Sequence, residues 1–258
     1  MMNNFICFLT VTMAIFQLNP AHSNDVAPVD TIELNSFNQF VARMQIGEYT
    51  CTGTYLSETV LLTSRHCIDR IENNSLPNRD NFILRGQVQG DQYEDASVIS
   101  GGYTLPRGQD MALVVVYPPL EPGTNSFPSI QHVSRDSIAR DHSLSLSGYP
   151  GSQLGTLVEG CGDAFSFPAN DGKDVIRYHI TTERGMSGSA LRICGNDNTI
   201  IGVHNWDGTG WGNVGLLFTE EDVEFINEFI KREKIHPFKN LDWLKLGPNF
   251  MAGTCPTP

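Results

Sequence analysis

The sequence predicts an all-β protein made of two six-stranded antiparallel β-barrels and one C-terminal helix. The 258 residues include 24 Gly and 14 Pro, a composition typical of chains with many tight turns. Short apolar or alternating runs recur along most of the chain. A proline-rich stretch separates them into two sets of six, and closing each set into a barrel would remove exposed strand edges. The pattern alone also permits an open sandwich.

The first six strands are predicted where apolar or alternating residues run between polar turns. They cover Gln39–Gln45, Tyr49–Leu56, Val60–Cys67, Phe82–Val88, Ala96–Tyr103 and Met111–Val116. The following stretch, Tyr117–Pro128, contains four prolines, which disfavour regular structure and indicate a crossover. The second set covers Ser143–Gly148, Leu154–Phe167, Val175–Thr181, Ala190–Cys194, Thr199–Asn205 and Val214–Phe218.

One helix is predicted, over Glu220–Lys234. Thr219 is a suitable N-cap, acidic residues occupy the first turn and basic residues the last, which complements the helix dipole. We expect this helix to pack on the second barrel. The expected domains are a signal peptide over 1–23, a first barrel over 24–120, a second barrel with its helix over 121–234, and an irregular tail over 235–258.

The N-terminal segment predicts export to a secreted or periplasmic location. The apolar stretch Phe5–Leu18 is too short to span a bilayer, and the small residues Ala21 and Ser23 suit a cleavage site. No Lys or Arg precedes Arg43, so a buried N-terminal helix is the alternative. We expect no membrane span in the mature chain.

Cysteines are compatible with disulfides if the chain is exported. Removal of a leader that carries Cys7 leaves five, an odd number. The favoured pairs are Cys51 with Cys67 and Cys161 with Cys194. Cys255 competes for either partner of the second pair, or stays unpaired or forms an intermolecular bond in a chain otherwise expected to be a monomer.

The charge balance disfavours nucleic acids as partners. Lys and Arg total 17 against 29 Asp and Glu, a formal net charge of −12 that repels phosphate backbones and anionic lipid surfaces.

Three segments carry the residue types of nucleophilic catalysis. His66 follows an apolar run and adjoins Cys67, Asp110 begins a strongly apolar strand, and Ser187 lies in the glycine-rich segment Gly185-Met186-Ser187-Gly188-Ser189. A histidine can take a proton from a serine while a buried carboxylate holds its other ring nitrogen. The glycines let backbone amides turn toward an oxyanion, for which Gly185 and Ser187 are the expected donors. Each segment by itself has an ordinary structural interpretation.

Together, and in the order His, Asp, Ser, the three segments resemble the chymotrypsin-like serine peptidases. This resemblance covers about Phe40 to Ile230 and implies two barrels with His66, Asp110 and Ser187 as the catalytic triad. The chain departs from many members at Met186, where they have an aspartate that pairs with a newly cut N-terminus.

A closer resemblance is to the bacterial glutamyl endopeptidase branch. It rests on Gly148-Tyr149-Pro150-Gly151, Thr181-Thr182, the nucleophile segment and Ile201-Gly202-Val203-His204. The resemblance implies that Thr182 and His204 line the primary pocket and bind a glutamate side chain. Asp207, also expected in the pocket wall, would repel an acidic substrate, so a preference for basic or small residues stays open.

The sequence therefore predicts a serine endopeptidase that cleaves protein or peptide substrates without a cofactor or metal. Two alternatives remain: an inactive homologue that acts as a binding protein, and an esterase that uses the same chemistry on small acyl substrates.

Overall fold

The computed structural model describes residues 27–28, 37–46, 49–73, 81–86, 93–105, 109–117, 119–120, 126–152, 155–165, 174–196, 198–206 and 212–235. The predicted signal peptide, the tail beyond Ile235, Asp207 and Cys255 lie outside these residues.

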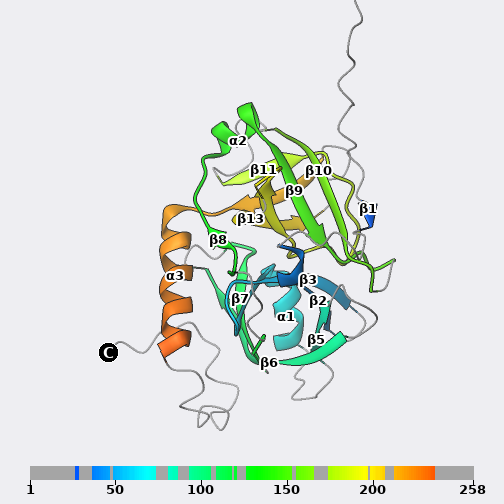
Figure 1. Cartoon of the computed structure of the whole chain (residues 1–258), viewed down its shortest axis with the longest axis vertical. Coiled ribbons are helices and arrows are strands. Elements are labelled where there is room, and N and C mark those ends of the chain that lie inside the picture. Colours follow the sequence, from blue (N-terminus) through cyan, green and yellow to red (C-terminus); the bar gives the residue numbers. More distant parts are fainter. Residues whose placement is uncertain are drawn as a thin grey trace, which may run out of the picture.

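Six strands of the N-terminal half form a closed antiparallel barrel in the order β2-β3-β4-β7-β6-β5 (Figure 1). Each strand pairs with two neighbours, so the barrel has no open edge. The strands are β2 (Val41–Ile46), β3 (Tyr49–Tyr55), β4 (Val60–Thr63), β5 (Asn81–Gly86), β6 (Tyr93–Thr104) and β7 (Ala112–Tyr117).

Six strands of the C-terminal half are paired in a ring as well. Strand β10 pairs with β9 and β11, β11 with β14, β14 with β13, β13 with β12, and β12 with β9. The strands are β9 (Ser143–Gly148), β10 (Val158–Phe165), β11 (Val175–Tyr178), β12 (Ala190–Ile193), β13 (Thr199–Trp206) and β14 (Asn213–Leu217). Two short strands extend this sheet: β1 (Ala27–Pro28) pairs with β10, and β8 (Ser129–Ile130) runs parallel to β13. The predicted fold class is thereby confirmed.

Two α-helices and one short 3-10 helix were not predicted. Helix α1 (Arg65–Asn73) replaces the end of the third predicted strand, which was extended wrongly to Cys67. The physical reason lies far along the chain: the Asp110 carboxylate accepts the backbone N–H of His66 in the first turn, where helix N–H groups lack partners. Helix α2 (Arg135–Asp141) has a local signal, because the Ser134 side chain caps it by accepting the N–H of Ser137. The 3-10 helix η1 (Asn38–Phe40) precedes β2.

Helix α3 (Glu220–Ile235) begins as predicted, with a reciprocal cap at Thr219. The Thr219 hydroxyl oxygen accepts the N–H of Asp222, while the Asp222 carboxylate accepts the N–H of Thr219 at 2.9 Å.

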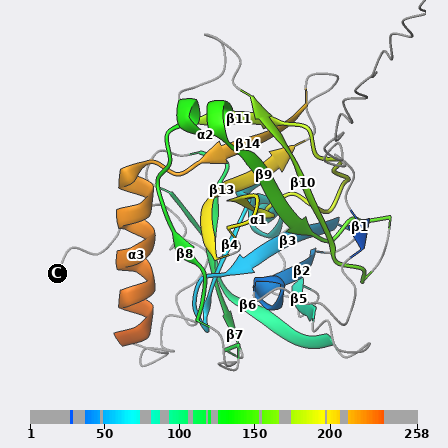
Figure 2. The same ribbon diagram turned by 45° about the horizontal axis from the view of Figure 1, so that its top comes forward.

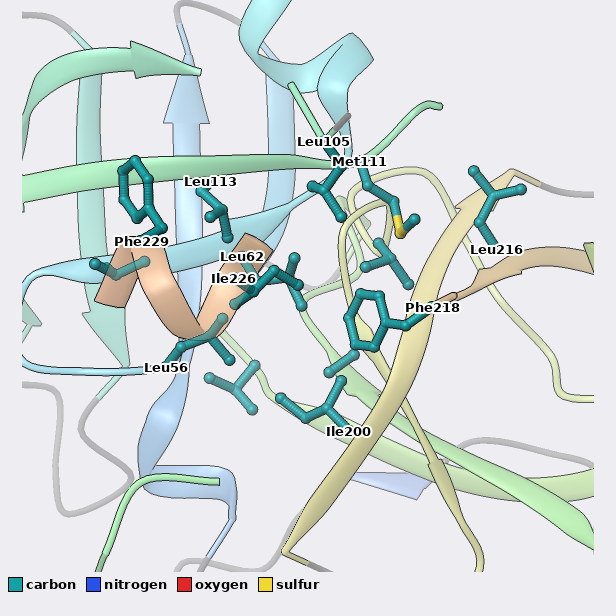
Figure 3. Packing of buried hydrophobic residues seen from close by; sticks show 14 of the residues in the cluster. Leu56, Leu62, Leu105, Met111, Leu113, Ile200, Leu216, Phe218, Ile226 and Phe229 are labelled. Atoms are coloured by element: carbon teal, nitrogen blue, oxygen red, sulfur yellow. The ribbon is translucent and has the colours of Figure 1, made fainter. Parts of the chain in front are cut away.

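The sequence predicted that α3 packs on the second barrel, and in the structure it packs on the first barrel as well. Its buried residues Ile226 and Phe229 belong to one apolar cluster with Leu62 and Leu113 of the first barrel and Ile200 of the second (Figure 3). Figure 2 shows α3 running along one side of the molecule next to both sheets. The helix therefore holds the two barrels together, and the catalytic candidates lie on opposite sides of the barrel boundary.

Replacing Phe229 with Ala tests this role of α3. Phe229 is 2% exposed, so the truncation should lower the free energy of unfolding by about 3–5 kcal/mol. The matched control is Glu228→Ala in the same helix, whose side chain is 69% exposed and which should change stability by less than about 0.5 kcal/mol. Chemical denaturation measures both. Equal effects of the two substitutions would contradict the packing role.

Candidate active site

His66 and Asp110 form a close pair in the first barrel. Nδ1 of His66 lies 2.7 Å from Oδ2 of Asp110, and the His66 backbone N–H donates to Oδ1, also at 2.7 Å. An ionised carboxylate can only accept, so Nδ1 carries the hydrogen and Nε2 of the neutral ring is left as the base. The side chains are 37% and 24% exposed, which leaves the imidazole accessible to a substrate.

The environment of Asp110 favours its ionised form. Burial alone would raise the pKa of Asp110, but hydrogen bonds from the His66 ring and backbone, the charge of that imidazole when protonated, and a hydrogen bond from Asn205 outweigh it. Together they lower the pKa below its ordinary value of 3.8. Asp110 is therefore negatively charged at neutral pH and stabilises the imidazolium that would form during proton transfer.

Asn205, at the end of β13, links this pair to the second barrel. Its side-chain amide donates to the backbone carbonyl of Asp110 at 2.5 Å and to Oγ of Ser64 at 3.3 Å. The Ser64 hydroxyl in turn donates to the carbonyl of His204 at 3.0 Å. Asn205 was not among the residues predicted from the sequence. The signal that could have found it is a polar amide at the end of an apolar strand, where burial demands partners.

Ser187 lies in the loop before β12, on the second barrel. Its backbone carbonyl accepts the N–H of Thr52 at 2.8 Å and lies 3.9 Å from the sulfur of Cys67, the neighbour of His66. The Ser187 hydroxyl donates to the backbone carbonyl of Asn205 at 3.0 Å. Within the described residues no hydrogen bond joins this hydroxyl to His66. The fold thus brings the predicted serine beside the histidine segment, with its hydroxyl directed to Asn205.

The nucleophile loop needs glycine at two positions. Gly185 has φ +103° and Gly188 has φ +91°, a region that other residues rarely adopt. A Cβ on Gly185 would also lie 2.6 Å from the carbonyl oxygen of Tyr149. A Cβ on Gly188 would collide with the carbonyl oxygen of Thr52. Each glycine is therefore required both by its dihedral angle and by the close approach of another backbone segment.

The amides of Gly185 and Ser187 are available as donors. Among the described residues, neither N–H donates a hydrogen bond. The carbonyl of Arg184 accepts the N–H of Gly151 at 2.6 Å. In a trans peptide the C=O and N–H point in opposite directions, so this bond turns the Gly185 N–H away from Gly151. Both amides are thus without an acceptor among the described residues, as the donors of an oxyanion hole must be.

Met186 is fully buried in the apolar cluster of the second barrel, with Ile138 and Leu144 among its members. A thioether in such a cluster neither carries charge nor attracts an ammonium group. The loop is held without the ion pair between an aspartate at this position and a new N-terminus.

Two of the three predicted specificity residues, His204 and Thr182, lie in the described part of the chain. His204 is 1% exposed, and its Nδ1 lies 2.5 Å from the hydroxyl of Tyr178, a fully buried residue that was not predicted from the sequence. Thr182 is partly buried in the loop that leads to Ser187. Asp207 lies outside the described residues.

Two disulfides join the pairs favoured by the sequence, Cys51–Cys67 and Cys161–Cys194. The first connects β3 to the opening turn of α1, so it fixes the segment that carries His66.

Cys51, Cys67 and His66 are also the one group of potential metal ligands among the described residues. The sulfurs of Cys51 and Cys67 are bonded to each other, so they are not available as thiolate ligands.

Two antiparallel barrels, with a His–Asp pair on one and a serine loop with unpaired amides on the other, define the class of chymotrypsin-like serine peptidases. The chain belongs to the trypsin-like peptidase domain family, whose family model matches residues 51–203. The matched region contains His66, Asp110 and Ser187. A comparison with curated proteins finds no match.

Solved structures with similar folds include a Glu endopeptidase, with 22% identity and a TM-score of 0.61 over 79% of this chain and 95% of that one. An inactivated protease paralogue from the scabies mite has 17% identity and a TM-score of 0.62 over 81% and 99%. Neuropsin, a serine protease of mouse brain, has 14% identity and a TM-score of 0.56 over 76% and 94%. At these identities the likeness establishes the fold alone.

No helix in the described part of the chain is long and apolar enough to cross a membrane.

The lowered pKa of Asp110 predicts a pH-dependent contribution to stability. Because the folded-state pKa lies below the unfolded one, this contribution is complete above the ordinary pKa and is lost as the pH falls through the folded value. The free energy of unfolding should therefore differ most between wild type and Asp110→Asn near pH 6–7, and the difference should shrink below about pH 4. Denaturant titrations across this range measure it. A difference independent of pH would contradict the assignment.

Proposed function

We propose that this protein is an exported serine endopeptidase that hydrolyses peptide bonds through an acyl-enzyme. Ser187 is the nucleophile, His66 the general base and Asp110 the residue that holds the imidazole. The observation that carries the proposal is the double hydrogen bond between His66 and Asp110, next to a serine loop whose two amides are unpaired.

In the proposed reaction, Oγ of Ser187 attacks the carbonyl carbon of the substrate while Nε2 of His66 takes the hydroxyl proton. The amides of Gly185 and Ser187 bind the resulting oxyanion. Collapse of the tetrahedral intermediate breaks the C–N bond, and the imidazolium gives its proton to the leaving amine. A water molecule then attacks the acyl-enzyme and loses a proton to His66. The acyl C–Oγ bond breaks, the imidazolium returns the proton to Oγ of Ser187, and the acid product is released.

The starting position of the serine hydroxyl is compatible with this sequence. Its hydrogen bond to the Asn205 carbonyl must be exchanged for one to His66, which requires rotation about a single side-chain bond. Catalytic hydrogen bonds are often absent or long in unliganded enzymes and tighten when substrate binds.

We further propose a preference for acidic residues before the cleaved bond. The support is the resemblance of the Thr182 and His204 segments to glutamyl endopeptidases and the fold shared with a Glu endopeptidase. A histidine that gains a proton can form a charge-assisted hydrogen bond with a carboxylate. The Tyr178 hydroxyl, 2.5 Å from Nδ1, would hold the orientation of the ring.

Export is supported by the two disulfides, which persist in oxidising compartments, and by the apolar N-terminal stretch of the sequence. Proteins or peptides are the expected substrates.

The second candidate function is that of an inactive homologue which binds other proteins. The hydroxyl of Ser187 is engaged by Asn205 and not by His66, and the fold is shared with an inactivated protease paralogue. Activity measurements separate this candidate from the first.

Ser187→Ala is the principal test of the proposed chemistry. The purified wild type should cleave an unfolded protein and be labelled at Ser187 by a fluorophosphonate, whereas the variant should lose label and at least about 10³-fold in kcat, because the acyl-enzyme cannot form. Circular dichroism confirms that both are folded. A folded wild type that neither cleaves nor labels would favour the binding protein, and faster turnover of small esters than of peptides would favour the esterase.

Cleavage of a peptide library tests the specificity proposal. Glu should be enriched before the cut in wild type, and His204→Leu should abolish that enrichment while leaving some cleavage after other residues, since the substrate carboxylate loses its partner. Ser187→Ala serves as the control for contaminating proteases. A wild-type profile without enrichment of Glu or Asp would contradict the proposed preference for acidic residues.

A further inference from the structure

Thr52 is a fully buried residue of β3 that bonds to the nucleophile loop through both its backbone and its side chain. Its N–H donates to the carbonyl of Ser187 at 2.8 Å. Its hydroxyl donates to the carbonyl of Gly185 at 2.9 Å and accepts the N–H of Tyr149 at 3.0 Å. Its own carbonyl accepts the hydroxyl of Thr63 at 2.8 Å. One residue of the first barrel therefore holds two backbone segments of the second, the nucleophile loop and the segment at Tyr149.

The hydroxyl bond acts on the residue that has the most conformational freedom. Gly185 has two flanking peptide planes, and with φ +103° no Cβ restricts either of them. The Gly151 amide fixes the plane before it through the Arg184 carbonyl at 2.6 Å. The Thr52 hydroxyl fixes the plane after it through the Gly185 carbonyl. The Gly185 N–H lies in the first plane, and the second plane leads through Met186 to the Ser187 N–H. Holding both planes therefore fixes the two donor amides relative to each other.

The same residue is tied to the histidine. Thr52 directly follows Cys51, whose disulfide partner Cys67 directly follows His66. The segment with the general base and the segment with the oxyanion donors are thus fixed to two consecutive residues of one strand. A displacement of β3 would move both together.

Thr54 shows that a buried threonine in this strand has no general need for such bonds. It lies two residues further along β3, on the same face by the alternation of a strand, and is also fully buried. Its hydroxyl has no hydrogen-bond partner in the described part of the chain. The bonds of Thr52 are therefore specific to its position opposite the nucleophile loop.

We infer that the Thr52 hydroxyl is a positioning group for the oxyanion hole, acting through the Gly185 carbonyl. The inference rests on the proposed function, because an oxyanion must form for the hole to matter. Without the hydroxyl, the Gly185–Met186 peptide is held only through the Met186 N–H, which donates to the Glu183 carbonyl at 3.1 Å. This peptide lies between the two donor amides, so its rotation changes the direction of the Ser187 N–H relative to the Gly185 N–H, and the two no longer face the developing charge together. The ground-state substrate does not depend on these donors to the same extent.

The test compares Thr52→Val, which preserves shape and removes the hydroxyl, with Thr52→Ser, which restores it, and Thr54→Val as matched control. In Thr52→Val, kcat should fall about 10- to 100-fold with KM changed less than about threefold, as for partial loss of one oxyanion donor. Binding of a peptide aldehyde, which forms a tetrahedral adduct with Ser187, should weaken by a similar factor. Thr52→Ser should recover most of kcat, and Thr54→Val should match wild type.

A second readout does not require turnover. The backbone amide NMR signals of Gly185 and Ser187 should shift or broaden in Thr52→Val and stay in place in Thr54→Val. If Thr52→Val does not fold, Thr52→Ala takes its place in both experiments.

The outcomes separate the inference from the proposed function. Unchanged kcat in a folded Thr52→Val or Thr52→Ala, or equal losses of kcat in the Thr54 control, would overturn the inference while the peptidase function stands. An inactive wild type would overturn the proposed function. In that case, unchanged amide signals in the Thr52 variant would overturn the positioning role too, and displaced signals would support it.

Discussion

The hydrogen bonds that cross between the two barrels are the constraint on which the candidate site depends. Each barrel closes on its own strands, so neither brings a base and a nucleophile together by itself. The N–H of Thr52 donates a hydrogen bond to the Ser187 carbonyl, and the Ser64 hydroxyl donates one to the His204 carbonyl. These bonds are buried, where an unpaired backbone group would be costly, so they fix the spacing of the barrels more sharply than apolar contacts alone. Gly188 permits this close approach, because a Cβ there would strike the Thr52 carbonyl.

The apolar cluster beneath α3 supplies the complementary, less directional force. Residues of β4 and β7, of β13 and of the helix contribute to one cluster, so the boundary between the barrels is packed like the interior of a domain. Burial gives the association its strength, and the polar contacts give it its register. A site assembled from both barrels needs both the apolar packing and the polar contacts, because displacements of about 1 Å already impair catalysis.

Electrostatics at the site follow from this arrangement. Asp110 begins an apolar strand, where an isolated carboxylate would be unfavourable. The His66 ring and backbone and the Asn205 amide satisfy it, and together they keep its pKa low. The same carboxylate supplies an acceptor to the first turn of α1. One negative charge therefore stabilises the helix, orients the imidazole and prepares the site for a positive charge on it.

Sequence patterns were most informative where the determinants are local. Short apolar or alternating runs located the strands of both barrels within a few residues, and the Thr219 cap located the start of α3 because its partner Asp222 is three residues away. The cap of α2 at Ser134 was equally local and was overlooked. Helix α1 was missed because the acceptor for its first turn comes from Asp110, which no window around His66 contains.

The sequence by itself determined the residue types of the candidate site and their order. The local sequence is sufficient to recognise a histidine beside a cysteine, an acid at the start of a strand and a serine among glycines. Only the tertiary structure decided which groups support them. Thr52, Asn205 and Tyr178 carry no motif, and each acquires its role from a partner far along the chain across a barrel or the barrel boundary. The physical reason is that a buried polar group has no preferred partner until folding removes water and leaves it one neighbour to bond.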